Sequence, residues 1–289
     1  MTIPAFDLLT PASVAEASGM LLDHGDEARP IAGGTTLVIL MKQRALRFSH
    51  LVDLQSIPGL DRITETDGGL SIGALATHRS VERSALVSRY APALAQAFRH
   101  VGNVRIRETA SVGGNLAHAD YRLDPPPVLL VLGAEVVLSG AQGTRVVALK
   151  DFYRGMYETV LEPGEILTEV QVPRAPAAQR TVYARFSSLS ANDWPCIGTA
   201  VSLTLDGGNV GELRVGLSGV AEAPLLAAGL ERFQDERCSG ELWDAVCDAI
   251  DGQISPVADL RGSADYKREM TRVFVKRTLR ELAGPAASS

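Results

Sequence analysis

Two of the four Gly-Gly pairs in this sequence limit the possible folds and ligands of the chain more than any other feature. Ala32-Gly33-Gly34-Thr35-Thr36 joins a predicted strand to an apolar helix, and Ser111-Val112-Gly113-Gly114-Asn115 precedes the segment 116–120. Paired glycines allow several backbone N–H groups to converge and let a ligand approach the backbone closely. A helix that begins after such a turn adds a favourable dipole for an anion. Each segment is therefore either a diphosphate-binding turn or a purely structural one.

The other two pairs have different surroundings. Residues 68–69 and 207–208 each follow an aspartate between alternating strand patterns, which is typical of hairpin turns. None of the four pairs forms GxGxxG or the phosphate loop that ends in Gly-Lys-Ser/Thr. A Rossmann dinucleotide site and an NTPase site are both disfavoured.

The chain length of 289 residues suggests about two domains at roughly 150 residues each. Residues 1–57 alternate helix and strand patterns, residues 58–177 contain hairpins, strands and short helices, and a proline-containing linker lies at 173–179. We therefore predict one domain over 1–177 and a second over 178–289. The second contains three strands and then helices at 241–250 and 265–282; the last helix carries a basic face that is either solvated or binds an acidic partner.

The composition limits the partners and the reactions that are possible for this chain. The net charge of −6 argues against nucleic acid and anionic membrane as partners. No apolar run approaches the roughly 18 residues of a membrane span, and the start shows no signal-peptide pattern, so we expect a cytoplasmic protein. Three cysteines without CxxC spacing are too few for a conventional iron–sulfur cluster, and the five histidines form no zinc motif. Redox chemistry would therefore need an organic cofactor or another chain.

The two glycine segments together resemble the medium, flavin-binding subunit of molybdenum hydroxylases. This family includes the medium subunit of carbon monoxide dehydrogenase and the flavin domain of xanthine dehydrogenase. The resemblance covers nearly the whole chain, because further segments follow in the family order: 51–54, 70–74, 124–126, 132–134, 163–167 and 259–282.

The resemblance implies an α+β fold: a two-part FAD-binding domain of the vanillyl-alcohol oxidase type, followed by a small C-terminal domain with a three-stranded sheet and helices. It implies that FAD binds non-covalently and that its pyrophosphate is held by the two glycine segments. The residues that would contact the cofactor are Ala32, Gly33, Gly34, Thr35, Thr36, Leu37, Ser111, Val112, Gly113, Gly114, Asn115, Asp124, Ile166, Leu167, Arg185 and Trp194. No catalytic acid or base and no metal ligand is expected in this chain.

Four of these positions need comment. Ser111 stands where many members carry threonine, which keeps the hydroxyl. Arg185 falls where xanthine dehydrogenase-like members often carry lysine, a change that keeps the cation but alters its geometry. Trp194 either contacts the flavin or is a packing or interface residue. His118, outside the set, is expected to cap the turn after the second segment rather than to act in catalysis.

The implied function is electron transfer through FAD within a multi-subunit molybdenum hydroxylase. A small partner would carry two [2Fe–2S] clusters and a large partner the molybdopterin site, in a dimer of heterotrimers. One alternative is a stand-alone FAD-dependent reductase or oxidase of the same fold, and another is a cofactor-free scaffold or nucleotide-binding module that kept the fold. Neither the hydroxylated substrate nor the terminal electron acceptor follows from the sequence.

Overall fold

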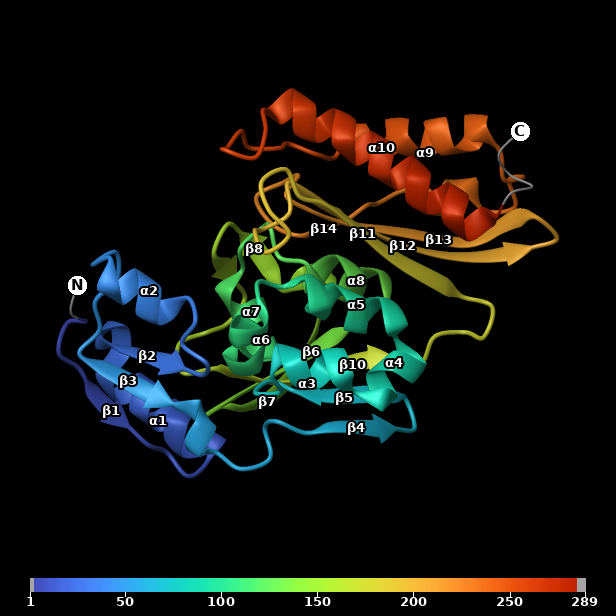
Figure 1. The fold of residues 1–289 in the computed structure, drawn as a ribbon. Coiled ribbons are helices and arrows are strands. Elements are labelled where there is room, and N and C mark those ends of the chain that lie inside the picture. Colours follow the sequence, from blue (N-terminus) through green and yellow to red (C-terminus); the bar gives the residue numbers. More distant parts are fainter. Residues whose placement is uncertain (1–2, 285–289) are drawn as a thin grey trace.

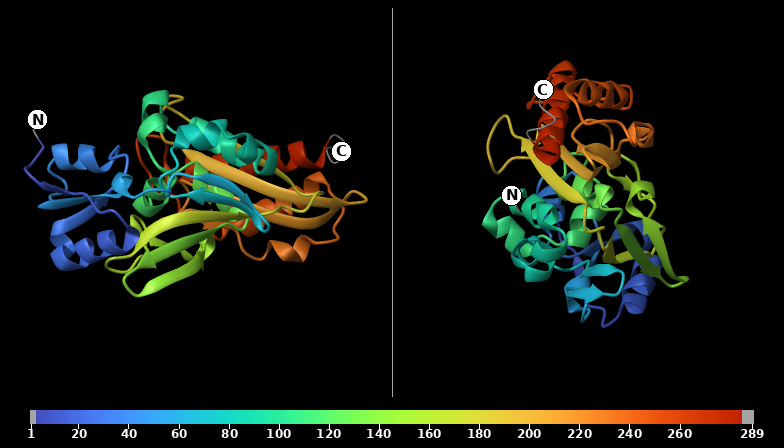
Figure 2. Two further views of the ribbon diagram at one scale, coloured as in Figure 1. Left: turned by 90° about the horizontal axis from the view of Figure 1, so that it is seen from below. Right: turned by 90° about the vertical axis from the view of Figure 1, so that its right-hand side faces the viewer.

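The first part of the chain forms a three-stranded parallel sheet in the order β1-β3-β2. The computed structural model describes residues 3–284, so the expectation about the chain start lies partly outside the described residues. The elements are β1 (Asp7–Leu9), α1 (Val14–His24), β2 (Ala28–Ile31), α2 (Leu37–Lys42) and β3 (His50–Asp53). Ser13 Oγ accepts from Glu16 N at 3.1 Å and thereby begins α1. The described part of the chain starts at one end of the molecule and finishes at the opposite end (Figures 1 and 2).

A five-stranded antiparallel sheet forms the middle of the molecule, in the order β4-β5-β10-β6-β7. Its strands are β4 (Ile63–Thr66), β5 (Gly69–Gly73), β6 (Glu135–Gly140), β7 (Gly143–Ala148) and β10 (Ile166–Pro173). Between them in sequence come α3 (His78–Arg83), α4 (Ala85–Tyr90), α5 (Pro92–His100), α6 (Val104–Thr109), α7 (Val112–His118) and α8 (Pro125–Val131), which gather over one side of the sheet (Figure 1). Strands β8 (Tyr153–Gly155) and β9 (Glu158–Thr159) form a separate hairpin.

The C-terminal part is a four-stranded sheet covered by two helices. It contains β11 (Arg180–Phe186), β12 (Ile197–Asp206), β13 (Asn209–Ser218), β14 (Leu225–Leu226), α9 (Gly240–Asp251) and α10 (Ala264–Ala283). The three expected strands are present, and the two-residue β14 adds a fourth by pairing with β13. A strand of two residues is too short to show the alternation by which a strand is recognised in sequence.

The two larger parts are stacked in layers. The C-terminal sheet lies between α5 and α8 on one side and α9 and α10 on the other (Figure 1). Gly216 on β13 approaches α8 so closely that a Cβ there would lie 2.3 Å from the carbonyl oxygen of Pro127. One core surrounds Phe98 and Leu129 above the five-stranded sheet, and a second surrounds Trp243 beneath α9 and α10. The packing joins the two parts without a gap at this junction.

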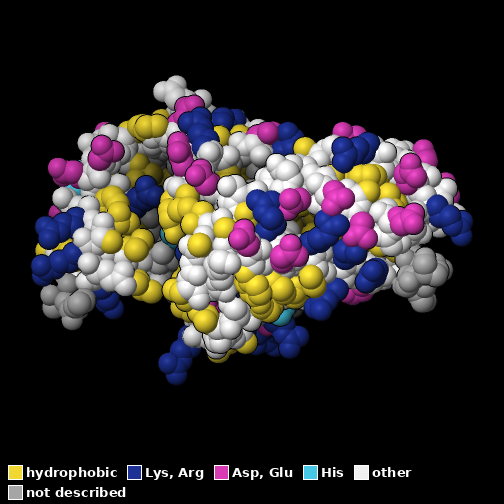
Figure 3. Space-filling view, turned by 90° about the horizontal axis from the view of Figure 1, so that it is seen from above, with side chains coloured by type: hydrophobic (Ala, Val, Ile, Leu, Met, Phe, Trp, Pro, Cys, Tyr) yellow, Lys and Arg dark blue, Asp and Glu magenta, His cyan; other side chains and the backbone are white. Residues whose placement is uncertain are grey.

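Four of the six basic side chains of α10 form ion pairs within the chain, and the other two, Arg277 and Arg280, are exposed. Arg272 reaches both Asp244, at 2.9 Å, and Asp248 on α9, at 2.5 Å. Arg268 pairs with Asp251 at 2.8 Å. The helix surface therefore carries charges of both signs (Figure 3).

Within residues 3–284 no helix is both long and apolar enough to cross a membrane. In the same range no group of three or more His, Cys, Asp and Glu side chains is arranged to hold a metal ion.

Candidate functional site

The two glycine segments meet in space. A Cβ added to Gly33 would lie 1.8 Å from the carbonyl oxygen of Thr109 and 3.1 Å from the Cα of Ala110. Backbone therefore packs directly on backbone, which only glycine permits at position 33. The first segment is thus fixed against the residues that lead into the second.

The start of α2 is left open by the protein. Of the α-helices in residues 3–284, α2 alone has neither a capping side chain nor a proline in its first turn. Among the described residues, no acceptor is found for the backbone N–H groups of Gly33, Gly34, Thr35 and Thr36. The first backbone donor that finds a helical acceptor is Val38 N, which bonds Gly34 O at 3.0 Å. A helix start with unused N–H groups is a binding site for an anion.

The second segment is not a turn, as the sequence predicted, but the first turn of α7. Ser111 Oγ caps this helix by accepting from Gly114 N at 3.2 Å. The N–H of Val112 bonds Ala76 O at 2.9 Å and the N–H of Gly113 bonds Ala74 O at 2.7 Å. These backbone donors serve the protein itself, so the expectation that this segment supplies a set of free N–H groups is wrong.

The glycines of α7 have two different roles. Gly113 is buried, and a Cβ there would lie 2.6 Å from the Cβ of Ala74, so this glycine lets α7 approach the five-stranded sheet. Gly114 is exposed, and the only atom near its missing Cβ is the capping Ser111 Oγ, at 2.8 Å. Position 114 is therefore the one where a ligand could approach the backbone of α7.

Asn115, within α7, provides a second polar group that the protein leaves unused. Its Oδ1 is buried and has no partner among the described residues. A buried amide oxygen without a hydrogen bond is costly. The unused N–H groups at the start of α2 are donors that fit the phosphate oxygens of FAD, whereas Asn115 Oδ1 is an acceptor and would need a donor such as a hydroxyl group of the cofactor.

Asp124 and Arg185 bind each other in a buried network. Tyr183 OH donates to Asp124 Oδ1 at 2.6 Å, and Arg185 Nη1 lies 3.3 Å from the same carboxylate. Burial raises the pKa of Asp124 to about 6, although the arginine and the tyrosine act in the opposite direction. The guanidinium of Arg185 also donates to His100 O and to Ser187 Oγ, at 2.8 and 2.6 Å. The polar atoms of this pair are thus engaged within the protein, and their contact with a flavin stays a prediction.

Ile166 and Leu167 begin β10 and point to opposite faces of the sheet. Ile166 packs with Ala17 and Leu21 in the N-terminal core, whereas Leu167 joins the core above the five-stranded sheet. Both side chains are almost fully buried. At most one of them can face a given ligand, and main-chain contact is the simpler role for this position.

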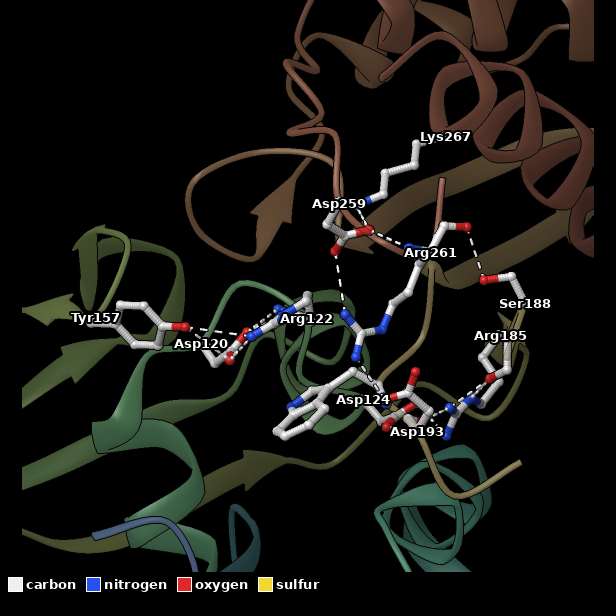
Figure 4. A network of polar contacts seen from close by, with 12 residues as sticks. Asp120, Arg122, Asp124, Tyr157, Arg185, Ser188, Asp193, Asp259, Arg261 and Lys267 are labelled. Carbon is white, nitrogen blue, oxygen red and sulfur yellow. Dashed lines mark hydrogen bonds and ion pairs between the residues drawn. The ribbon is translucent and has the colours of Figure 1, made fainter. Parts of the chain in front are cut away.

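Trp194 lies on the surface between two guanidinium groups. The Cζ of Arg122 is 5.1 Å and that of Arg261 is 5.6 Å from the indole ring (Figure 4). Asp120 holds Arg122 through two bonds of 2.9 and 2.6 Å, and Asp193 holds Arg261 at 2.6 Å. Sequence reasoning missed these partners, and no spacing pattern would have shown them, because they come from segments far apart in the chain.

His118 ends α7 and packs its ring 5.2 Å from that of Tyr157. Burial lowers its pKa. The arrangement agrees with a packing role at the end of the helix.

Comparison with known proteins places the chain in a class. Residues 4–175 match the family described as the FAD binding domain in molybdopterin dehydrogenase, and residues 183–282 match the C-terminal domain of the CO dehydrogenase flavoprotein. The chain belongs to this family of FAD-binding medium subunits of molybdenum hydroxylases, as its sequence predicts, and it is an oxidoreductase subunit with FAD as its cofactor.

Individual relatives match over nearly their whole length. The carbon monoxide dehydrogenase medium chain of Afipia carboxidovorans is 34% identical over 279 residues, which cover 95% of this chain and 96% of that protein. The xanthine dehydrogenase FAD-binding subunit of Escherichia coli O157:H7 is 26% identical over 95% of both chains. The solved carbon monoxide dehydrogenase of Hydrogenophaga pseudoflava superposes with a TM-score of 0.93 and 34% identity, over 96% of this chain and 97% of the other.

Proposed function

We propose that this chain passes electrons through bound FAD from the [2Fe–2S] clusters of a small partner to an external acceptor. The molybdopterin site would lie on a large partner. FAD supplies the redox chemistry, and the protein supplies binding, position and electrostatics. Similarity to medium chains of named dehydrogenases supports the proposal.

The observation that carries the proposal is the uncapped start of α2, whose N–H groups have no partner among the described residues. The unpartnered Oδ1 of Asn115 in α7 supports it. The N–H groups of residues 33–36 would hold the pyrophosphate, and Gly114 leaves room for it along α7. Neither group brings a positive charge, so the affinity would come from backbone dipoles and hydrogen bonds. Asp124, Leu167, Arg185 and Trp194 are proposed to lie further along the cofactor. The division into a FAD-binding domain over 1–177 and a C-terminal domain over 178–289 is part of the same proposal.

The experiment is cofactor identification on the purified full chain. Heat or acid precipitation should release FAD into the supernatant in a one-to-one ratio with protein. Flavin that stays with the precipitate would show covalent attachment, and FMN in place of FAD would remove the proposed role of the two glycine segments. Rapid flavin reduction by NADPH or an organic substrate in the isolated chain would favour the stand-alone alternative.

A further inference from the structure

Positive charge is concentrated in the N-terminal part, although the chain as a whole is acidic. Residues 28–52 contain Arg29, Lys42, Arg44 and Arg47 but no aspartate or glutamate, whereas the net charge of the whole chain is −6. Lys42 ends α2, and Arg44 and Arg47 lie in the loop that follows it. The net charge is an average over the chain, so it does not exclude an anionic partner for this segment.

The three cations at the end of α2 have no anionic partner in the described part of the chain. Lys42, Arg44 and Arg47 are exposed, and none of them is in an ion pair within residues 3–284. The basic side chains of α10 differ, because four of the six have carboxylate partners. The charged groups beside α2 are therefore available to an anionic partner.

A Schellman motif at the end of α2 fixes the backbone that carries these cations. Ala45 N donates to Leu40 O at 2.9 Å, and Arg44 N donates to Met41 O at 3.0 Å. Arg44 has a φ of +61° at the position of this motif where glycine is usual. The chain thus carries an arginine where the conformation favours glycine, which points to a role for the charge of this residue.

Apolar side chains are exposed in the same region. Ile39 on α2 is 49% exposed, and Leu46 in the loop after α2 is 37% exposed. Leu8 on β1 is 53% exposed. Single exposed apolar residues are normal, but apolar residues gathered beside unpaired cations are typical of an interaction site.

Leu8 lies on the same side of the N-terminal sheet as α2. Successive residues of a strand face alternate sides, and Leu9 packs against the core that contains Ala17 and Leu21 of α1. The helices α1 and α2 cover opposite sides of the three-stranded sheet (Figures 1 and 2), so Leu8 faces the side of α2. We call the following residues the α2 surface: Leu8, Ile39, Lys42, Arg44, Leu46 and Arg47.

The α2 surface belongs to the part that forms one end of the molecule. Figure 3 shows dark blue and yellow side chains side by side at this end. Aliphatic side chains bordered by unpaired cations are typical of segments that lie on an anionic membrane. The centre of a protein–protein interface is instead poor in lysine and rich in aromatic residues. A surface at the end of the molecule can also meet a flat bilayer without obstruction by the rest of the chain.

We propose that the α2 surface binds the surface of a bilayer that contains anionic lipids. Lys42, Arg44 and Arg47 pair with lipid phosphates, and Ile39 and Leu46 enter the interface between the headgroups and the acyl chains. Binding of this kind is peripheral and reversible, because three cations and a few aliphatic side chains give a modest affinity. The inference goes beyond the proposed function and does not depend on it.

The test is co-sedimentation of the full FAD-loaded chain with large unilamellar vesicles. One set of vesicles contains equal parts of phosphatidylglycerol and phosphatidylcholine, and a second set contains phosphatidylcholine alone. A sample without lipid measures self-association. The wild type should bind the anionic vesicles roughly tenfold more tightly than the neutral ones, and added salt should weaken this binding.

Lys42→Gln and Arg47→Gln should each weaken binding to the anionic vesicles roughly fivefold, which is the effect of one cation near an anionic lipid surface. Leu46→Asp should weaken it at least as much, because the variant places a negative charge at the lipid interface. Arg280→Gln is the matched control, since Arg280 is an exposed residue of α10 without an ion pair among the described residues. Flavin content and unfolding midpoint should be the same in these four variants.

Arg44→Gly separates the charge of this residue from its backbone conformation. Glycine adopts a φ of +61° more easily than arginine, so the unfolding midpoint should stay the same or rise. Binding to the anionic vesicles should nevertheless fall roughly fivefold. Weaker binding by a protein that is at least as stable as the wild type cannot result from misfolding.

Equal binding of the wild type to both kinds of vesicle, or binding to neither, would overturn the proposal. Wild-type affinity in the variants at positions 42, 44 and 47 would overturn it as well, because another surface would then bind the lipid. Retention of the wild type on immobilised poly-glutamate, without binding to vesicles, would assign the α2 surface to an acidic protein instead. None of these results bears on the proposed function, which the release of FAD tests separately.

Discussion

Gly33 and Thr109 touch through their backbones, and this contact joins the segment before α2 to the end of α6, which leads into α7. The missing Cβ of Gly33 would lie 1.8 Å from Thr109 O, so no other residue fits without moving one segment. In the candidate FAD site, Gly33 therefore packs against the protein backbone, while the N–H groups at the start of α2 have no protein partner among the described residues and can bind the ligand.

Gly33→Ala should separate the two segments. We expect a loss of roughly 2 kcal/mol or more in the free energy of unfolding, from the steric clash, and a large drop in bound FAD. Gly19→Ala is the matched control: Gly19 lies in α1 with nothing within 4 Å of its Cβ position, and the change should be neutral or stabilising by up to about 1 kcal/mol. Denaturant unfolding and flavin content measure both effects, and equal results for the two variants would contradict the role of the contact.

Asn115→Leu should separate ligand binding from folding. The variant removes a buried oxygen that has no partner, so the FAD-free protein should be as stable as the wild type or slightly more stable. FAD should bind roughly fivefold more weakly, the effect of one lost hydrogen bond donated by a neutral group of the cofactor.

Asn103→Leu should give the reverse pattern. Asn103 Oδ1 caps α6 by accepting from Arg105 N and Ile106 N at 3.0 and 3.2 Å. Its loss should cost about 1 kcal/mol of stability and leave FAD affinity unchanged. Unchanged FAD affinity in Asn115→Leu would remove Asn115 from the site.

His78 should make stability depend on pH. Burial, with Arg107 acting in the same direction, lowers the pKa of His78 to about 4, from 6.5 in the unfolded chain. Between pH 6.5 and pH 4 the unfolded state binds a proton that the folded state does not bind. The stability that the neutral imidazole contributes is therefore complete above pH 6.5, and it is lost as the pH falls toward 4, by roughly 3 kcal/mol at most. Asp124 acts oppositely, because burial raises its pKa to about 6 and its contribution grows as the pH falls.

The measurement is therefore the free energy of unfolding of the wild type and of His78→Gln as a function of pH. Asp124 is present in both proteins, so its effect cancels in the difference. The wild type should lose more unfolding free energy than the variant between pH 7 and pH 5. Parallel curves would show that the buried imidazole does not titrate in this way.

Lys267→Met should destabilise the C-terminal part. It leaves Asp259 without its 3.0 Å partner, although Arg261 still pairs with that carboxylate, so we expect a loss of roughly 3 kcal/mol. Arg277→Met on the same helix is the control, since Arg277 is exposed, and should change stability by less than about 0.5 kcal/mol. A loss below about 1 kcal/mol for Lys267→Met would show that the buried pair contributes little to stability.

Local patterns in the sequence predict most of the helices and strands, and the resemblance predicts the α+β fold. What they miss depends on contacts between distant segments. The N–H groups of Val112 and Gly113 looked available in the sequence, but the carbonyl groups of Ala76 and Ala74, in the segment that follows β5, accept from them. Lys267 looked like part of a basic helix face, but its side chain is buried and pairs with the carboxylate of Asp259 in a loop.

Prediction of the site from the sequence has the same limit, because contacts between distant segments are not visible there. The first glycine segment was identifiable because strand, glycine pair and apolar helix are all local signals. The arginines around Trp194 were not, because Arg122 and Arg261 come from different domains and meet only in the folded chain.

The most direct test of the central claim is anaerobic stopped-flow at the flavin absorbance band. The reduced iron–sulfur chain, free of excess reductant, is mixed with the oxidised FAD-loaded protein. We predict that the flavin is bleached at a rate no slower than turnover of the whole complex, and that the substrate of the complex leaves the isolated flavoprotein oxidised. Flavin that stays oxidised with the reduced partner, or that is bleached rapidly by substrate in the isolated chain, would contradict the account.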